Sequence, residues 1–102
     1  MKKKVAILGS TGSIGTQALE VIRQHRDLFS VEVLTARRNA ELLIEQAMQH
    51  VPKVVVIADE NRYGGVRDAL ARLPVKVLAG MDALSEVVAL HKVEDPPPAG
   101  RA

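Results

Sequence analysis

The sequence predicts an α/β fold in which a parallel β-sheet is flanked by helices. Four short apolar runs alternate with four segments whose apolar residues recur at helical spacing, the order expected of right-handed βαβ units. Three regularly spaced glycines follow the first apolar run directly, where a strand should turn into a helix. The chain has 102 residues, of which 47% are hydrophobic, so it can form one domain with a modest core.

The first two units are predicted over residues 5–48. A short, fully apolar strand over residues 5–8 is typical of a central parallel strand, and a helix should follow over residues 13–26. The residues expected on one apolar face of that helix are Ile14, Ala18, Val21 and Ile22. A second strand is predicted over residues 31–35, and Asn39 is a good N-cap for the next helix. The apolar stripe of that helix consists of Ala40, Leu43, Ile44, Ala47 and Met48.

The second half of the chain repeats the pattern. After Pro52, strands are predicted over residues 54–58 and 75–78. The apolar residues that mark the two remaining helices are Val66, Ala69, Leu70 and Leu73, closed by Pro74, and then Leu84, Val87 and Val88. From residue 91 the chain reads HKVEDPPPAGRA, and a proline run enters neither a helix interior nor a central strand. We therefore expect one domain over residues 1–90 and a disordered tail over residues 91–102.

The glycine turn predicts a Rossmann-like dinucleotide site. Gly9, Gly12 and Gly15 form a G-x-x-G-x-x-G turn between a strand and a helix. Gly9 allows a sharp turn, Gly12 removes a Cβ where a pyrophosphate approaches, and Gly15 lets the helix pack closely. The N–H groups of the first helical turn should face the phosphates. The hydroxyl donors expected around the same anion are Ser10, Thr11 and Ser13. The alternative is an ordinary tight turn that binds no ligand.

The end of the second strand favours NADP over NAD. In NAD-binding folds an acidic residue at this place binds the ribose hydroxyls. Here Arg37, Arg38 and Asn39 occupy the place, and Glu32 lies at the wrong end of the strand. A guanidinium group offers a fixed fork of donors that suits a 2′-phosphate. The alternative is a pair of solvated loop arginines.

Composition argues against several other functions. The net charge is +2 and only Phe29 and Tyr63 are aromatic, so we expect no nucleic-acid partner. No apolar run approaches the roughly 20 residues of a membrane helix. No signal-peptide core follows the lysines at residues 2–4, so we expect a cytoplasmic protein with no membrane partner. There is no cysteine, the histidines are isolated, and no nucleophile has a paired base, so we assign no catalytic and no metal-binding residue.

Several segments resemble one enzyme family. LGSTGSIGTQALEVI resembles the N-terminal segment of 1-deoxy-D-xylulose 5-phosphate reductoisomerases, which act in the non-mevalonate pathway of isoprenoid biosynthesis. Three later segments resemble that family in the same order, namely VEVLTARRNAELLIEQA, PKVVVIADE and LPVKVLAGMDALSEVVAL. The resemblance covers about residues 3–90.

The resemblance implies an NADPH-dependent oxidoreductase. The family rearranges its phosphosugar substrate and reduces the product to 2-C-methyl-D-erythritol 4-phosphate, with magnesium, manganese or cobalt as divalent metal. Carried over by position, its NADPH contacts fall on Thr11, Gly12, Ser13 and Ile14, and on Arg37, Arg38 and Asn39. Asn39 is the firmer match in the second group, because positions 37 and 38 vary in the family. The full enzyme is expected to be a homodimer.

The chain departs from the family after residue 90. The family continues with another apolar strand and a long catalytic region that contains the metal ligands, where this chain has HKVEDPPPAGRA. The resemblance therefore implies a sheet that is incomplete at its C-terminal side and a chain that is inactive alone. An uncovered sheet edge would favour self-association. The alternatives are a stand-alone nucleotide-binding or regulatory module without catalysis, and a non-functional truncated product.

Overall fold

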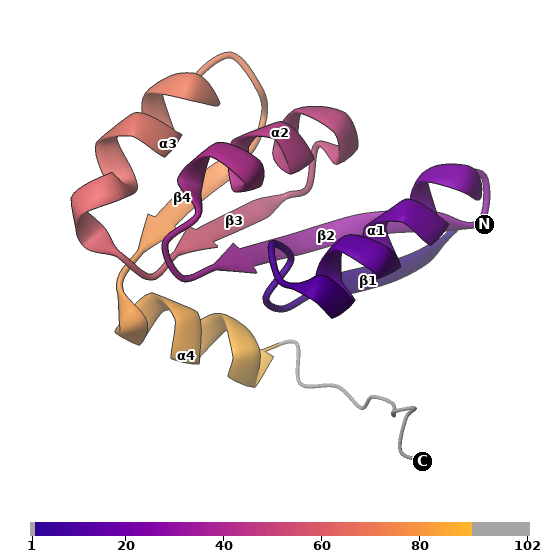
Figure 1. The fold of residues 1–102 in the computed structure, drawn as a ribbon, viewed down its shortest axis with the longest axis horizontal. Helices are drawn as coiled ribbons and strands as arrows, with labels where there is room; N and C mark the ends of the chain where they lie inside the picture. Colours follow the sequence, from indigo (N-terminus) through magenta and orange to yellow (C-terminus); the bar gives the residue numbers. More distant parts are fainter. Residues whose placement is uncertain (1, 91–102) are drawn as a thin grey trace.

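A computed structural model describes residues 2–90, which form a parallel sheet flanked by helices (Figure 1). The strands are β1 (Lys3–Ile7), β2 (Phe29–Ala36), β3 (Val54–Ile57) and β4 (Lys76–Ala79), and they lie in the order β1-β2-β3-β4. The helices are α1 (Ser13–Gln24), α2 (Ala40–His50), α3 (Tyr63–Ala69) and α4 (Met81–Leu90), with a 3₁₀ turn η1 (Glu60–Arg62) before α3. The predicted Rossmann-like α/β fold is confirmed. The predicted tail lies outside the described residues.

The helices are divided unevenly between the two faces of the sheet. Helices α1, α2 and α3 cover one face, and α4 lies against the other (Figure 1). The larger core lies under the first three helices and includes the fully buried Leu34 and Leu43. The smaller core joins Val33, Val56 and Val87 beneath α4.

The central strands are apolar because both of their faces are covered. In β3, Val55 and Ile57 belong to the larger core, while Val56 belongs to the smaller one and Val54 packs against it. A parallel strand buried on both sides reads as a continuous apolar run rather than an alternating one. This is why the four-residue run VVVI forms a strand without any period-two pattern.

A register shift displaces β2 relative to β1. Val5 pairs with Val31, but the next pair is Ala6 with Val33, so Glu32 is the extra residue of a bulge. The shift explains why Val31 and Leu34, three positions apart, both contribute to the larger core. No feature of the local sequence pattern predicts it.

The buried face of α1 differs from the predicted one. The residues of this helix that are buried are Gly15, Leu19 and Ile22. Ile14 is 83% exposed and Val21 is 54% exposed, although both belong to the predicted apolar face. In helix α2, Met48 at the end of the predicted apolar stripe is 51% exposed. The helical spacing therefore identifies the apolar positions, but the core covers only part of each predicted face.

Exposed and half-buried apolar residues of α1 lie beside the open edge of the sheet. Ile14, Ala18 and Val21 recur at helical spacing, and Ile14 and Ala18 border the same groove as Ala6 and Ile7 of β1. Strand β1 pairs only with β2 in the described sheet, so its other edge has free backbone groups. An apolar stripe next to an unpaired strand edge favours association with another polypeptide.

We predict that the 102-residue chain self-associates through this edge. Sedimentation velocity over a concentration series should show a mean mass that rises with protein concentration. Val21→Lys should lower that mass, because it places a charge in the apolar stripe. Met48→Lys is the matched control, since Met48 is equally exposed but lies on α2. A parent chain that stays monomeric at every concentration would contradict the prediction.

Helix α2 ends in an unusual backbone conformation. Val51 is its C-cap, with φ of 43° and ψ of 64°, and its N–H donates to the Ala47 carbonyl at 2.8 Å. The left-handed region is common for glycine and asparagine but rare for β-branched residues, whose Cβ crowds the backbone. Pro52 follows at once and prevents the helix from continuing.

We predict that Val51→Asn stabilises the chain. Asparagine tolerates the left-handed conformation, so the free energy of unfolding should rise by about 1 kcal/mol. The exposed Val51 side chain has little packing to lose. Urea denaturation measures the change, and Val51→Ile, which keeps the β-branch, should leave the midpoint unchanged. A lower midpoint for Val51→Asn would show that the valine is not strained.

Candidate functional site

The glycine turn between β1 and α1 has the backbone geometry that its sequence predicts. Gly9 has a φ of +74°, and a Cβ there would meet nothing within 4 Å, so the requirement for glycine is conformational. At Gly15 the requirement is space, because a Cβ would clash with the Gly9 carbonyl oxygen and lie 2.7 Å from the Cα of Ser10. Gly15 therefore lets the start of α1 pack directly against the turn.

Gly12 is open toward the outside of the protein. It is the N-cap of α1, its N–H donates to the Gly9 carbonyl at 3.1 Å, and its own carbonyl accepts from the Thr16 N–H at 2.9 Å. A Cβ at Gly12 would make only one ordinary contact, 3.5 Å from the Gly9 oxygen. The protein's own packing therefore does not require glycine here, whereas a ligand that approaches the main chain would.

The first turn of α1 has N–H groups available for an anion. Gly12 has no side chain to cap the helix, and no other described side chain takes that role. Thr16 makes the first backbone hydrogen bond of α1, so the amides of Ser13, Ile14 and Gly15 precede the helical hydrogen-bond pattern. Free N–H groups and the helix dipole together make a site for a phosphate.

Two residues that sequence reasoning missed hold the turn in place. Thr35 accepts a hydrogen bond from Gly9 N–H through Oγ1 and another from Ser10 N–H through its carbonyl, both at 2.8 Å. Gln46 of α2 accepts from the Ser10 hydroxyl through Oε1 at 2.7 Å and donates to the Ser10 carbonyl through Nε2 at 2.8 Å. Ser10 has no exposed surface, and Thr35 and Gln46 are also buried.

This network corrects the prediction for the Ser10 hydroxyl. The side chain points into the protein and binds Gln46, so it is not among the donors around the anion. One feature of the sequence could have indicated a buried hydrogen-bond network: Gln46 is a polar residue between Leu43 and Ala47 on the buried face of α2. A buried amide requires partners, but the sequence does not identify a partner 36 positions away.

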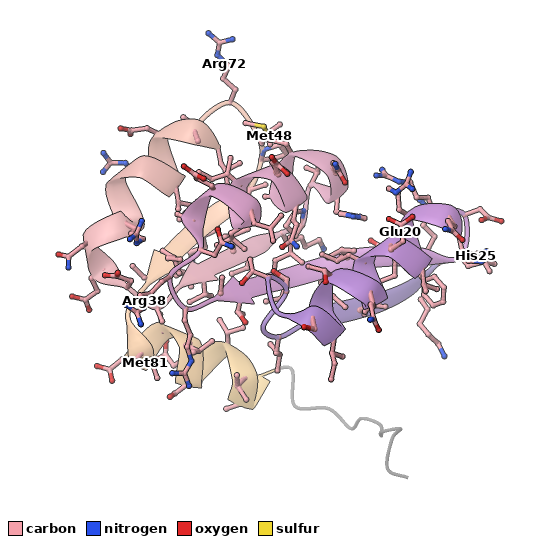
Figure 2. All side chains as sticks on the ribbon, viewed as in Figure 1. Glu20, His25, Arg38, Met48, Arg72 and Met81 are labelled. Atoms are coloured by element: carbon pink, nitrogen blue, oxygen red, sulfur yellow. The ribbon has the colours of Figure 1, made fainter. Side chains whose placement is uncertain are left out.

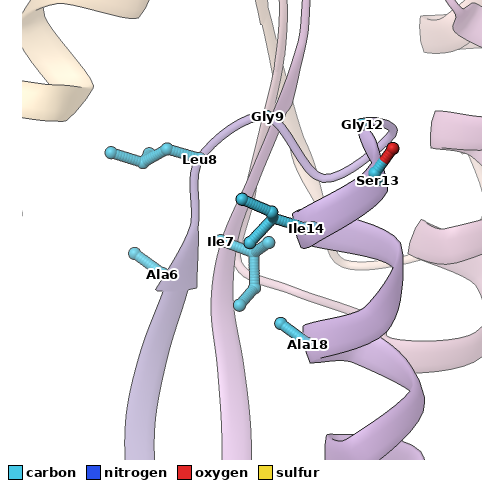
Figure 3. Close-up of a pocket in the computed structure, with 9 residues that line it drawn as sticks. Ala6, Ile7, Leu8, Gly9, Gly12, Ser13, Ile14 and Ala18 are labelled. Atoms are coloured by element: carbon cyan, nitrogen blue, oxygen red, sulfur yellow. The ribbon is translucent and has the colours of Figure 1, made fainter. Parts of the chain in front are cut away.

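A groove of about 580 Å³ lies between the end of β1 and the start of α1 (Figure 3). Ile14 extends from the helix toward the strand, and the Ser13 side chain lies at the start of the helix. Thr11 is half-buried, while Ser13 and Ile14 are exposed. The groove thus combines an apolar wall with the free amides of the helix start.

The loop over residues 37–39, called the arginine loop below, lies at the same carboxyl end of the sheet as the glycine turn. Arg37, Arg38 and Asn39 directly follow β2, which is the parallel neighbour of β1. Asn39 Oδ1 accepts from Leu42 N–H at 3.2 Å, which confirms the predicted N-cap of α2. Both arginines are exposed. A hollow of about 490 Å³ beside the loop is lined by Arg38, Asn39, Ala40, Glu41 and Arg62. Arg62 is a further residue that the sequence did not single out.

The rest of the described structure offers no second centre of this kind. Within residues 2–90, no group of three or more histidine, cysteine, aspartate or glutamate residues could hold a metal ion. Burial lowers the pKa of His50, with smaller contributions from Arg26 and Arg23, and this residue ends α2 away from the glycine turn. In the same residues, no helix has the length and apolar character needed to cross a membrane.

The comparisons with known proteins all point to the same family. The family model for 1-deoxy-D-xylulose 5-phosphate reductoisomerase matches residues 5–95. The reductoisomerase of Phocaeicola vulgatus is 55% identical over 94 residues, which cover 92% of this chain and 25% of the relative. The reductoisomerase of Porphyromonas gingivalis is 49% identical, and the match covers 92% of this chain and 24% of the relative. The chain thus spans about a quarter of the length of the curated relatives that it matches.

A solved structure supports the same assignment. The reductoisomerase from Zymomonas mobilis in complex with NADPH has a TM-score of 0.83 and 40% identity, covering 86% of this chain and 23% of that one. The fold, the order of the segments and the match over most of the sequence all agree with the resemblance seen in the sequence. The chain belongs to the 1-deoxy-D-xylulose 5-phosphate reductoisomerase family.

Proposed function

We propose that this chain is the NADPH-binding part of a 1-deoxy-D-xylulose 5-phosphate reductoisomerase, an oxidoreductase of isoprenoid biosynthesis. The proposal depends chiefly on one observation: no side chain among the described residues caps the start of α1, and the N-cap residue is Gly12, which leaves the main chain accessible. A relative that is 40% identical to this chain over the matched region was solved in complex with NADPH. When bound, NADPH supplies a hydride, and the residues of this chain bind and orient the NADPH molecule.

The start of α1 suits the pyrophosphate of the cofactor. The amides of Ser13 and Ile14 precede the helical hydrogen-bond pattern, and Gly12 leaves the main chain accessible. The Thr11 and Ser13 hydroxyls can add side-chain donors around the same phosphates. The positive end of the helix dipole compensates part of the negative charge. Gly9 and Gly15 shape the turn, and both line the groove beside it.

The loop after β2 suits the 2′-phosphate. Arg37 and Arg38 are exposed and close to the start of α2, and the Asn39 side-chain amide group remains available because the cap uses only its oxygen. Glu32 does not take the place of a ribose-binding acid, since it lies within β2 and pairs with Lys53 at 3.6 Å. The loop therefore offers donors to a phosphate and no carboxylate to a ribose hydroxyl.

Following the family resemblance, we propose that the metal site and the phosphosugar site of the full protein lie in the regions of the relatives that this chain does not match. The isolated chain should bind NADPH without catalysing the conversion. A cytoplasmic location stays a prediction.

We predict that the chain prefers NADPH to NADH. Titration calorimetry should show that Arg37→Ala and Arg38→Ala each weaken NADPH binding by about tenfold and leave NADH binding unchanged, because each removes a charged hydrogen bond to the 2′-phosphate. Arg72→Ala is the control, since Arg72 precedes β4 and points away from the molecule, whereas Arg38 follows β2 (Figure 2).

Three outcomes would contradict this prediction in different ways. Equal affinity of the parent chain for NADPH and NADH would exclude the 2′-phosphate role of the arginines. Tighter binding of a different nucleotide would favour a regulatory module. No nucleotide binding at all would favour a non-functional truncated product.

We also predict that Gln46→Leu weakens both the fold and the site. The substitution leaves the buried hydroxyl and carbonyl of Ser10 without their partner, so the free energy of unfolding should fall by about 1–3 kcal/mol. A less rigid turn should also bind NADPH more weakly in calorimetry. Gln49→Leu, at an exposed position of the same helix, is the control for urea denaturation. If the two variants unfold alike, Gln46 does not hold the turn.

A further inference from the structure

We infer that Arg62 is an additional anchor for the 2′-phosphate and helps to determine the preference for NADPH. This inference rests on the proposed function. Arg62 is the last residue of η1, and with Arg38 it lines the hollow of about 490 Å³ beside the arginine loop. It belongs to the turn after β3, whereas Arg38 belongs to the loop after β2, so the hollow is bordered by guanidinium groups from two successive connections.

The two connections are fixed relative to each other by the backbone. Strands β2 and β3 are parallel neighbours, and their pairing ends with Ala36 opposite Ile57. Just beyond, the Ala58 N–H donates to the Ala36 carbonyl and the Asp59 N–H donates to the Arg37 carbonyl, both at 2.9 Å. The sheet pairing therefore extends past the strand ends and keeps η1 beside the arginine loop.

Asp59 orients the Arg62 side chain. Its Oδ2 accepts from Arg62 Nε at 3.3 Å, and its Oδ1 accepts from Asn61 N–H at 3.1 Å. Arg62 N–H donates to the Asp59 carbonyl at 3.0 Å, which closes the turn. The carboxylate engages only Nε of the guanidinium, so the two terminal nitrogens remain available to phosphate oxygens. A half-exposed arginine that is held in this way is already oriented for an anion.

The two guanidinium groups at the hollow favour a phosphate over a hydroxyl. Arg38 and Arg62 line it together with Glu41, which lies in the first turn of α2, and a second carboxylate, that of Asp59, pairs with Arg62 through Nε. A monoester phosphate has a charge between about −1.5 and −2 near neutral pH, so it gains from each additional cation. A ribose 2′-hydroxyl has no charge, so an additional cation strengthens its binding little. Arg62 should therefore affect NADPH binding and leave NADH binding unchanged.

Calorimetric titration of the 102-residue chain with NADPH and NADH tests this inference. Arg62→Ala should weaken NADPH binding by about tenfold, as expected for the loss of a charged hydrogen bond, and change NADH binding less than twofold. Arg62→Lys should give an intermediate loss, because lysine keeps the charge but not the planar fork. Arg67→Ala is the matched control, since Arg67 is an exposed arginine of α3 that pairs with Asp68 and stacks on Tyr63.

The outcomes separate this inference from the proposed function. If Arg38→Ala lowers NADPH affinity selectively and Arg62→Ala does not, the proposed function stands and the inference about Arg62 is wrong. If Arg62→Ala weakens NADPH and NADH equally, Arg62 does not contact the 2′-phosphate and the inference is again wrong. If the parent chain shows no preference for NADPH, the proposed function is itself wrong. Urea denaturation of each variant confirms that it folds.

Discussion

The burial of Ser10 is the constraint on which the rest of the site depends. Its N–H, carbonyl and hydroxyl all form hydrogen bonds, to Thr35 and Gln46, so the turn is joined to β2 and to α2 at one residue. With Ser10 fixed, the chain turns through the left-handed conformation at Gly9, and the limited space beside the turn admits only a glycine at position 15. The amides at the start of α1 are thereby oriented before any ligand arrives, which lowers the entropy lost on binding.

In the proposed function, the parallel sheet divides recognition of the cofactor among three neighbouring connections. Because all strands point the same way, the segments after β1, β2 and β3 lie at the same carboxyl end of the sheet. The first presents backbone donors, which suit any pyrophosphate, while the second and third present guanidinium groups. In this proposal, general affinity and cofactor selectivity depend on different chemical groups, which substitutions can change independently.

Local sequence predicts the elements well and the contacts between them poorly. The alternation of strands and helices, the turn at Gly9 and the cap at Asn39 all depend on neighbouring residues, and the structure has them where expected. Ile14 is exposed although it lies on the predicted apolar face, because periodicity identifies an apolar face but not what covers it. The partners of Ser10 and the approach of Arg62 to Arg38 depend on residues far apart in the chain, and no local pattern contains that information.

The position of α4 determines on which side of the sheet a further parallel strand could be added. The first three crossovers place their helices on one face, and each adds a strand farther from β1. Helix α4 lies on the opposite face. A right-handed crossover through it would therefore place a following parallel strand beside the free edge of β1. Strand β1 would then be central, and the glycine turn would lie at a topological switch point, where open α/β sheets bind their ligands.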